Sequence, residues 1–220
     1  MERIDKSIID RFKKLDTTCV SDAMDRCGVF GAFEGIKAVV PGTSLCGQAF
    51  TTHNIPCTEK KETAGDYLDQ VEEGQVVVID NAGRTNMTVW GDLMSWVAMN
   101  NGVAGTIIDG VCRDIPAIRE MKYPIFTKGV NMVTGKQRVY MDAYNVPVSI
   151  GGVTVKPGDL IMADDSGALC IPFDYVMDVL QAAEEIDQKE KLIIGYVKEG
   201  KSLKEARQLT GYHTLQSRKE

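Results

Sequence analysis

The sequence lacks the features that mark membrane, secreted and zinc-bound proteins. No apolar run in its 220 residues approaches the about 20 residues that a membrane-spanning helix needs. The first residues carry acidic side chains and no apolar core, so we expect no signal peptide. Six cysteines are scattered without a C-x-x-C pair, which argues against a zinc site and for free thiols. These absences predict a cytoplasmic protein.

Histidine is scarce, and basic charge is not in excess. The two histidines, His53 and His213, stand outside the motifs described below, so surface or packing roles are expected for them and a histidine base is not. The chain has 25 basic and 31 acidic side chains, a net charge of −6. Because nucleic acids bind to basic faces, this charge argues against nucleic acid as a main partner.

Neither an internal repeat nor a low-complexity linker interrupts the chain, so we interpret residues 1–220 as a single domain. Helical spacing of apolar side chains predicts amino-terminal helices within about residues 1–28, with Thr18 or Ser21 as the cap of the second. Similar spacing predicts carboxyl-terminal helices over about residues 175–215. These helices are expected to pack on the central part of the domain.

The middle of the chain alternates between strand-like and helix-like segments. Predicted strands at Ala49–Thr52, Gln75–Asp80, Ala104–Ile108 and Ile125–Thr127 alternate with helix-like segments at 67–71, 93–99 and 115–120. This order predicts an α/β fold whose central sheet is parallel, with right-handed crossovers. Residues 81–86 are predicted to form a loop after the second strand.

The carboxyl-terminal half changes character, because its strands are short and are separated by turn-forming residues. The predicted strands are Val148–Val155, Leu160–Ala163 and Ala168–Ile171. Pro-Gly and Asp-Ser-Gly turns between them favour antiparallel hairpins. The sequence therefore predicts a parallel central sheet, a smaller antiparallel sheet and helices, arranged in layers.

The residues that carry chemistry follow the strand that ends at Ile108. In open α/β sheets ligands bind beyond the carboxyl ends of strands, where Asp109-Gly-Val-Cys-Arg-Asp114 stands. Arg113 offers a planar fork that suits a carboxylate, and Asp114 offers the hard oxygens that Mg²⁺ or Mn²⁺ prefers. Two simpler interpretations remain open: Asp114 could only cap the next helix, and Arg113 could only pair with Asp109.

A second segment, Trp90-Gly-Asp-Leu-Met94, opens the preceding helix. Free backbone amides at a helix start bind anions, and Gly91 would permit close approach. Asp92 could cap this helix or hold a metal-bound water. Two anion-binding helix starts, one of them with an Arg-Asp pair, favour a site for a 2-oxo acid.

These motifs resemble the RraA-like family. The resemblance rests on the Gly-Asp-Leu helix start and the Asp-Gly-x-x-Arg-Asp element, together with Val20–Met24, Gly47–Thr51, Val155–Leu160 and Asp164–Gly167. It spans about residues 16–200. The family includes 4-hydroxy-4-methyl-2-oxoglutarate / 4-carboxy-4-hydroxy-2-oxoadipate aldolases and regulators of ribonuclease E activity. It implies a three-layer β/β/α fold resembling the swivelling phosphohistidine domain, assembled as homotrimers or homohexamers.

The resemblance also implies roles for individual residues. Arg113 would bind the pyruvyl group, Asp114 would bind Mg²⁺ or another divalent metal, and Asp92 would organise a metal-bound water. Backbone amides around Leu93 and Met94, beside Gly91, would cradle the substrate carboxylate. A glutamate from the carboxyl-terminal helix of a neighbouring subunit completes the aldolase site; Glu190 is the best match, and the alternatives on the same stretch are Glu184, Glu185 and Asp187.

The combined prediction is a metal-dependent lyase that cleaves a 4-hydroxy-2-oxo acid to pyruvate by retro-aldol chemistry and decarboxylates oxaloacetate. A first alternative is a non-catalytic regulator that binds a ribonuclease. A second is a lyase for another 2-oxo or sugar acid, suggested by the long predicted loops 81–87 and 128–137. Cys112 lies in the motif but has no nearby histidine to activate it. No lysine stands in a motif typical of a Schiff-base aldolase.

Overall fold

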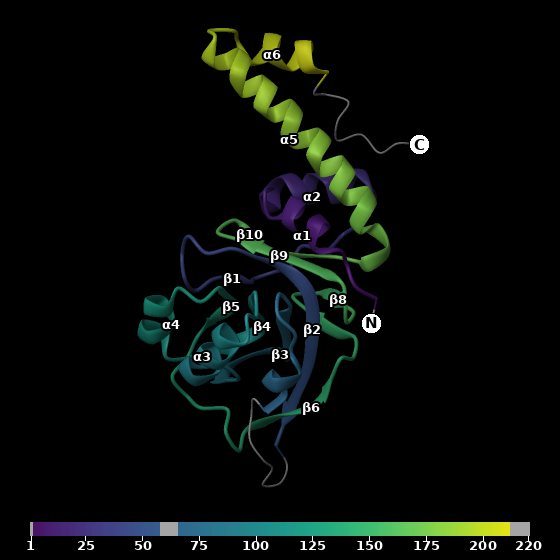
Figure 1. Ribbon diagram of the computed structural model, residues 1–220. Coiled ribbons are helices and arrows are strands. Elements are labelled where there is room, and N and C mark those ends of the chain that lie inside the picture. The colour runs from purple at the N-terminus through teal and green to yellow at the C-terminus, as the bar shows by residue number, and fades with distance from the viewer. Residues whose placement is uncertain (1, 58–65, 212–220) are drawn as a thin grey trace.

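The computed structural model describes residues 2–57 and 66–211, and Figure 1 shows their arrangement. His213 and the end of the predicted carboxyl-terminal helical region lie outside the described residues. Within them an eight-stranded sheet has the order β1-β5-β4-β3-β2-β9-β10, with β6 also paired to β2. Its strands are β1 (Lys37–Ala38), β2 (Leu45–Pro56), β3 (Val76–Thr88), β4 (Gly105–Cys112), β5 (Ile125–Val130), β6 (Val139–Tyr144), β9 (Leu160–Asp164) and β10 (Gly167–Ile171).

The centre of this sheet is parallel, as the sequence predicts. Strands β2, β3, β4 and β5 are parallel neighbours, whereas β1, β6, β9 and β10 pair antiparallel at the margins. Val76–Ile79 on β3 are all buried, because apolar layers cover both faces of the sheet. Val77 and Ile79 pack toward Trp90, while Val76 and Val78 pack toward the opposite layer. The molecule is a mixed α/β fold.

A small separate antiparallel sheet is formed by β7 (Val148–Ile150) and β8 (Val153–Val155). The prediction of one strand over 148–155 is wrong, because Gly151 and Gly152 adopt φ angles of 50° and 84° and turn the chain back. The β9–β10 hairpin is confirmed, but it extends the large sheet through β2 instead of forming a layer of its own. The likeness to the swivelling phosphohistidine domain stays a prediction.

The carboxyl ends of the central strands run further than predicted. The predicted loop 81–86 belongs to β3, whose pairing with β4 continues at Arg84–Gly110 and Thr88–Val111 after two register shifts. β4 continues to Cys112, so it includes four of the residues expected to follow the strand, and only Arg113 and Asp114 of that motif lie beyond it. The helix expected at 67–71 is a short 3₁₀ helix, η1 (Asp66–Gln70).

The helices fall into two groups (Figure 1). Near β9 and β10 lie α1 (Lys6–Phe12), α2 (Thr17–Arg26) and α5 (Val176–Lys198), and the far end of α5 projects from the body and carries α6 (Leu203–Thr210). At the other end of the molecule lie α3 (Asp92–Asn100) and α4 (Ile115–Met121). The cap of α2 is not Thr18 or Ser21 but Asp16, whose side chain accepts a 2.7 Å hydrogen bond from the Cys19 amide. None of the helices in residues 2–57 and 66–211 is long and apolar enough to cross a membrane.

Candidate functional site

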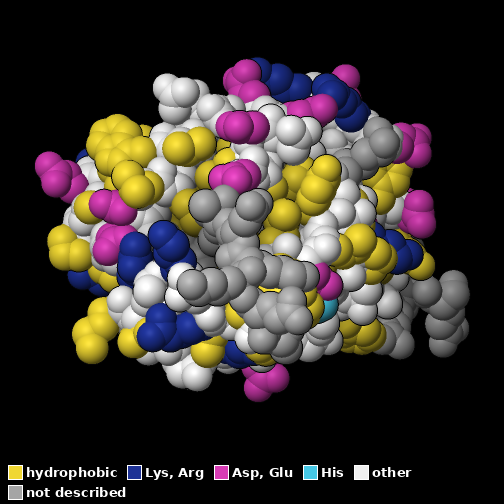
Figure 2. All heavy atoms as spheres, turned by 90° about the horizontal axis from the view of Figure 1, so that it is seen from below, with side chains coloured by type: hydrophobic (Ala, Val, Ile, Leu, Met, Phe, Trp, Pro, Cys, Tyr) yellow, Lys and Arg dark blue, Asp and Glu magenta, His cyan; other side chains and the backbone are white. Residues whose placement is uncertain are grey.

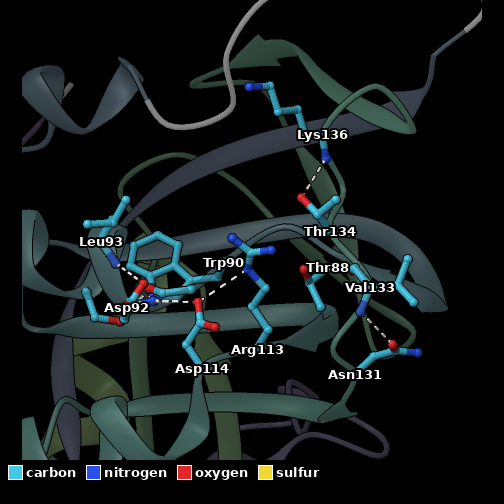
Figure 3. Close-up of polar contacts among 12 residues, drawn as sticks. Thr88, Trp90, Asp92, Leu93, Arg113, Asp114, Asn131, Val133, Thr134 and Lys136 are labelled. Atoms are coloured by element: carbon cyan, nitrogen blue, oxygen red, sulfur yellow. Dashed lines mark hydrogen bonds and ion pairs between the residues drawn. The ribbon is translucent and has the colours of Figure 1, made fainter.

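The two motifs singled out in the sequence meet in space, where α3 begins and where β4 passes into α4 (Figure 3). The backbone amide of Arg113 donates to the carbonyl oxygen of Trp90 at 3.0 Å. The backbone amide of Asp92 donates to Asp114 Oδ2 at 3.2 Å. The sheet thus brings together residues that are more than twenty positions apart.

Asp114 stands at the N-cap position of α4 without capping it. Its side chain makes no capping hydrogen bond, and its backbone is left-handed, with φ 60° and ψ 36°. Such a conformation costs about 1 kcal/mol or more in a non-glycine residue and is concentrated at functional sites. The interpretation of Asp114 as a simple helix cap is therefore wrong, because its carboxylate turns to the start of α3.

Gly91 makes this arrangement possible because it has no side chain. A Cβ atom there would collide with Asp114 Oδ2 and would lie 3.3 Å from Arg113 Nε. The φ and ψ angles of Gly91, −152° and −165°, are extended and open to any residue. Steric room for the neighbouring carboxylate, and not backbone freedom, is thus what requires glycine here.

Arg113 does not pair with Asp109, so that interpretation is wrong as well. Arg113 Nε lies 3.3 Å from Asp114 Oδ2, whereas Asp109 Oδ1 lies 2.6 Å from Lys128 Nζ. The side chains of Arg113 and Asp114 are 40% and 34% exposed, so a small solute can reach both. A guanidinium and a carboxylate side by side at the surface can bind an anion and a cation together.

The start of α3 attracts carboxylates, as its dipole and free amides predict. Asp114 takes the amide of Asp92, and Asp92 Oδ1 takes the amide of Leu93 at 2.7 Å. A substrate carboxylate bound at Leu93 must therefore replace the side chain of Asp92. The cradle role of Leu93 and Met94 stays a prediction. Trp90 anchors this helix start, because it is buried and its Nε1 donates to Ser95 Oγ at 2.8 Å.

The segment 131–136 runs beside the end of β4, and no spacing of residues in the sequence identifies it. The amide of Asn131 donates to the Cys112 carbonyl oxygen, and the Thr88 amide donates to the Val133 carbonyl oxygen, both at 3.0 Å. In the view of Figure 3 the segment lies on the opposite side of Arg113 from Leu93. These contacts place part of the predicted loop 128–137 beside the site.

The candidate acids of the carboxyl-terminal helix are not brought to this site within one chain. They lie on α5, at the end of the molecule opposite α3 (Figure 1). Three of them form ion pairs within the chain: Glu184 with Arg11, Glu185 with Arg26, and Asp187 with Lys191. Hydrogen bonds from Arg11 lower the pKa of Glu184. Any contact between Glu190 and Arg113 therefore requires a second copy of the chain.

Among the described residues, neither a reactive thiol nor a histidine joins the site. Burial raises the pKa of the Cys112 thiol to about 12, so it is not a nucleophile. His53 lies on β2, with Nδ1 2.7 Å from Asp142 Oδ1. In the described part of the chain no group of three or more His, Cys, Asp or Glu side chains could hold a metal ion. A metal here would be bound by one or two carboxylates, and the remaining positions are left for water and substrate, which is a common arrangement for Mg²⁺.

Basic and acidic side chains lie close together on the end of the molecule that is seen from below (Figure 2). Seen from below, the end that carries α3 and β6 shows several Lys and Arg side chains close together, next to acidic ones (Figure 2). The chain as a whole is acidic, with a net charge of −6.

Fold and site together define an α/β protein with an Arg-Asp pair and an anion-attracting helix start at the carboxyl ends of its parallel strands. The chain belongs to the RraA-like family, whose model, described as Aldolase/RraA, matches residues 17–170. That match covers both motifs of the site.

Individual relatives agree with this assignment. Protein DlpA of Legionella pneumophila is 41% identical over 193 residues, which are 86% of this chain and 31% of that protein, so the chain spans about a third of its length. A protein of Halalkalibacterium halodurans named "Putative 4-hydroxy-4-methyl-2-oxoglutarate aldolase" is 32% identical over 84% of this chain and 86% of its own. The crystal structure of Streptomyces coelicolor RraAS2, described as an unusual member of the RNase ES inhibitor RraA protein family, is 28% identical with a TM-score of 0.78, covering 87% of this chain and 97% of that one.

Proposed function

We propose that this protein is a divalent-metal-dependent lyase that cleaves a 4-hydroxy-2-oxo acid to pyruvate and also decarboxylates oxaloacetate. The observation that carries the proposal is the position of Asp114. Its left-handed backbone turns the carboxylate away from its own helix, toward Arg113 and the start of α3. Two relatives carry the name "Putative 4-hydroxy-4-methyl-2-oxoglutarate aldolase", which supports the reaction class.

Asp114 is the residue that would hold Mg²⁺ or Mn²⁺, with Asp92 beside it. These residues suit a metal ion for two reasons. Gly91 has no side chain and so leaves room for the Asp114 carboxylate, and Asp114 is partly exposed. Hard carboxylate oxygens suit these ions. When bound, the metal supplies Lewis-acid stabilisation of negative charge on the substrate's keto oxygen.

The side chains of the protein perform the remaining work. Arg113 binds the 2-oxo acid through its guanidinium and offsets charge on the keto oxygen. The amides of Leu93 and Met94 receive the C1 carboxylate after Asp92 has left the Leu93 amide. Through a water, Asp92 takes the proton of the C4 hydroxyl.

Cleavage then follows from this arrangement. As the C4 hydroxyl loses its proton, a carbonyl forms at C4, the C3–C4 bond breaks, and its electron pair moves into the enolate of pyruvate. A proton added at C3 completes pyruvate. In oxaloacetate the same C3–C4 bond breaks with loss of CO₂ and leaves the same enolate, so one site serves both reactions.

We further propose that the protein acts as a homotrimer or homohexamer in the cytoplasm, with Glu190 of one subunit reaching the site of another. The projecting end of α5 with α6 supports this, because it carries exposed apolar side chains that a partner would cover: Leu192, Ile194, Val197, Leu203 and Leu209. The proposed role of Glu190 is proton transfer at the site.

The second candidate function is regulation of a ribonuclease without chemistry. The likeness to RraAS2, a member of an RNase ES inhibitor family, favours it. A lyase acting on another 2-oxo or sugar acid is the third: the segment 131–136, bonded to Cys112 next to Arg113, would contact the distal part of its substrate. A substrate panel separates this case from the first.

The deciding experiment is pyruvate release from oxaloacetate and from 4-hydroxy-4-methyl-2-oxoglutarate, with Mg²⁺ or Mn²⁺ and with EDTA. We expect activity with metal, its loss in EDTA, and its loss in Asp114→Ala. Activity that persists in EDTA or in Asp114→Ala contradicts the metal assignment. An inactive but folded protein that co-purifies with a nuclease supports the regulator instead.

A further inference from the structure

A second pair of charged side chains, Asp109 and Lys128, lies at the carboxyl ends of β4 and β5 outside the proposed reaction. Lys128 Nζ and Asp109 Oδ1 are 2.6 Å apart, and the two side chains are 29% and 9% exposed. The other carboxylate oxygen of Asp109 accepts a 3.1 Å hydrogen bond from the buried amide of Gly151. Asp109 thus joins β4 both to β5 and to the β7–β8 hairpin.

The pair stands where the strand ladder is interrupted. Ile108 pairs with Thr127 and Val111 pairs with Gly129, so β4 has one more residue than β5 across this stretch. On its other side, β4 pairs with β3. Asp109 pairs with Asp80, and the next residue, Gly110, pairs with Arg84, so three residues of β3 lie between these two pairs. Ladder hydrogen bonds cannot hold β4 regularly here, and bulges of this kind re-aim the residues that follow.

The backbone of β3 at Gly83 lies close to the same pair. A Cβ atom on Gly83, whose φ is +66°, would lie 3.2 Å from Lys128 Nζ and 3.7 Å from Asp109 Oδ1. Asp80, the partner of Asp109 in the β3–β4 register, accepts from the amides of Ala82 and Ser149. The two buried aspartates therefore fasten the same hairpin, but only Asp109 also holds a lysine of β5.

We infer that Asp109 and Lys128 are positioning residues for the Arg113–Asp114 pair. Asp109 precedes Arg113 by four residues, and the ion pair holds β4 to β5 at its irregular point, directly before the turn that aims both functional side chains. Beyond it, the end of β4 is held by the β5 ladder that resumes at Val111 and by the hydrogen bond from the Asn131 amide to the Cys112 carbonyl oxygen. The expected effect on catalysis rests on the proposed lyase function, whereas the hold of the ion pair on the end of β4 does not depend on it.

The test compares Lys128→Met and Asp109→Asn with the charge-retaining Lys128→Arg. Lys37→Met is the matched control, because Lys37 is an exposed lysine on β1, the other neighbour of β5. Hydrogen–deuterium exchange over residues 105–121 measures how well the backbone amides at the end of β4 are protected, whether or not the protein is a lyase. KM and kcat/KM for oxaloacetate show whether Arg113 is still correctly placed. Thermal unfolding shows that each variant is folded.

We expect exchange at residues 109–114 to rise about tenfold in Lys128→Met and Asp109→Asn, with little change elsewhere. KM for oxaloacetate should rise and kcat/KM should fall about 100-fold, as expected for a misplaced binding group. Lys128→Arg should keep most of the wild-type protection from exchange and most of the wild-type kcat/KM, and Lys37→Met should match the wild type in both. Wild-type exchange at residues 109–114 in both variants overturns the inference, as does loss of protection spread evenly over the sheet. If the wild type releases no pyruvate, the lyase proposal fails while the exchange result still decides the positioning role.

Discussion

The backbone amide of Asp92 donates a 3.2 Å hydrogen bond to the carboxylate of Asp114, and this bond ties the starts of two helices to one another. The Asp114 side chain therefore accepts a hydrogen bond from the start of α3 and makes no capping bond to α4, the helix that it precedes in the chain. A carboxylate at a helix start is stabilised by the amides and the dipole of that helix. The same bond holds the proposed metal ligand at the place where a substrate anion would bind.

Replacing Gly91 by alanine should lower activity strongly while leaving the fold intact. The added methyl group would displace the Asp114 carboxylate, and its backbone angles suit alanine. We expect pyruvate release to fall about 100-fold, as for other small misplacements of reacting groups. Gly167→Ala is the control, because a Cβ there meets nothing within 4 Å. Full activity in Gly91→Ala would show that the position of Asp114 does not matter.

Arg113→Lys tests whether the guanidinium binds as a fork. Lysine keeps the positive charge but loses the planar, two-pronged geometry that matches a carboxylate or a keto acid. We expect kcat/KM for oxaloacetate to fall about tenfold or more, with an unchanged unfolding temperature, because the side chain is 40% exposed. Steady-state kinetics measure this. Wild-type kinetics in Arg113→Lys would limit the residue to a simple charge.

Glu190 can be tested by mixing two inactive variants. A protein with Arg113→Ala lacks its own site arginine, and one with Glu190→Ala lacks the acid that a neighbour would receive. If Glu190 acts across a subunit boundary, random reassembly of equal amounts should restore about a quarter of the wild-type sites. Pyruvate release after mixing and exchange measures this. An inactive mixture whose subunits have exchanged excludes a shared site between these residues.

Asp164 should make stability depend on acid pH. Burial alone raises the pKa of this carboxyl, but hydrogen bonds from the amide and hydroxyl of Thr17 and from the amide of Ser166 outweigh it, so the pKa lies below its ordinary value of 3.8. Because the folded protein holds the proton less well than the unfolded chain, the stabilisation is complete above pH 3.8 and is lost as pH falls through the lowered pKa.

The variant Asp164→Asn should therefore lower the unfolding temperature by about 2–4 °C at pH 7, the shift that a loss of about 1 kcal/mol gives in a chain of this size. The difference from the wild type should shrink as pH falls below 3.8 and through the lowered pKa of Asp164. Thermal unfolding followed by circular dichroism at several pH values measures it, with the exposed Asp25→Asn as the control. A difference that stays constant with pH would rule out the carboxylate as its source.

The central strands and their parallel order could be predicted because they depend on local pattern. Val76–Ile79 form a β-branched apolar run, which a strand buried on both faces requires, and the alternation with helices follows from it. The ends of β3 and β4 could not be predicted in this way. Residues 81–86 have loop-like composition, yet pairing of Arg84 with Gly110 keeps them within a strand. The sequence does not single out Asp16 as the cap of α2, since several neighbouring residues could serve equally well.

For the site, the sequence by itself determined which residue types are available: an arginine and an aspartate after a strand, and a glycine and an aspartate at a helix start. It could not decide between a capping and a ligand-binding Asp114, because both depend on the same local residues. The tertiary structure excluded a side-chain cap on α4, through a residue far away in the chain: without a side chain on Gly91, the carboxylate fits against α3. It also decided that Asp109 pairs with Lys128 on β5 and leaves Arg113 to the site, since ion pairs between strands follow from sheet order and not from spacing along the chain.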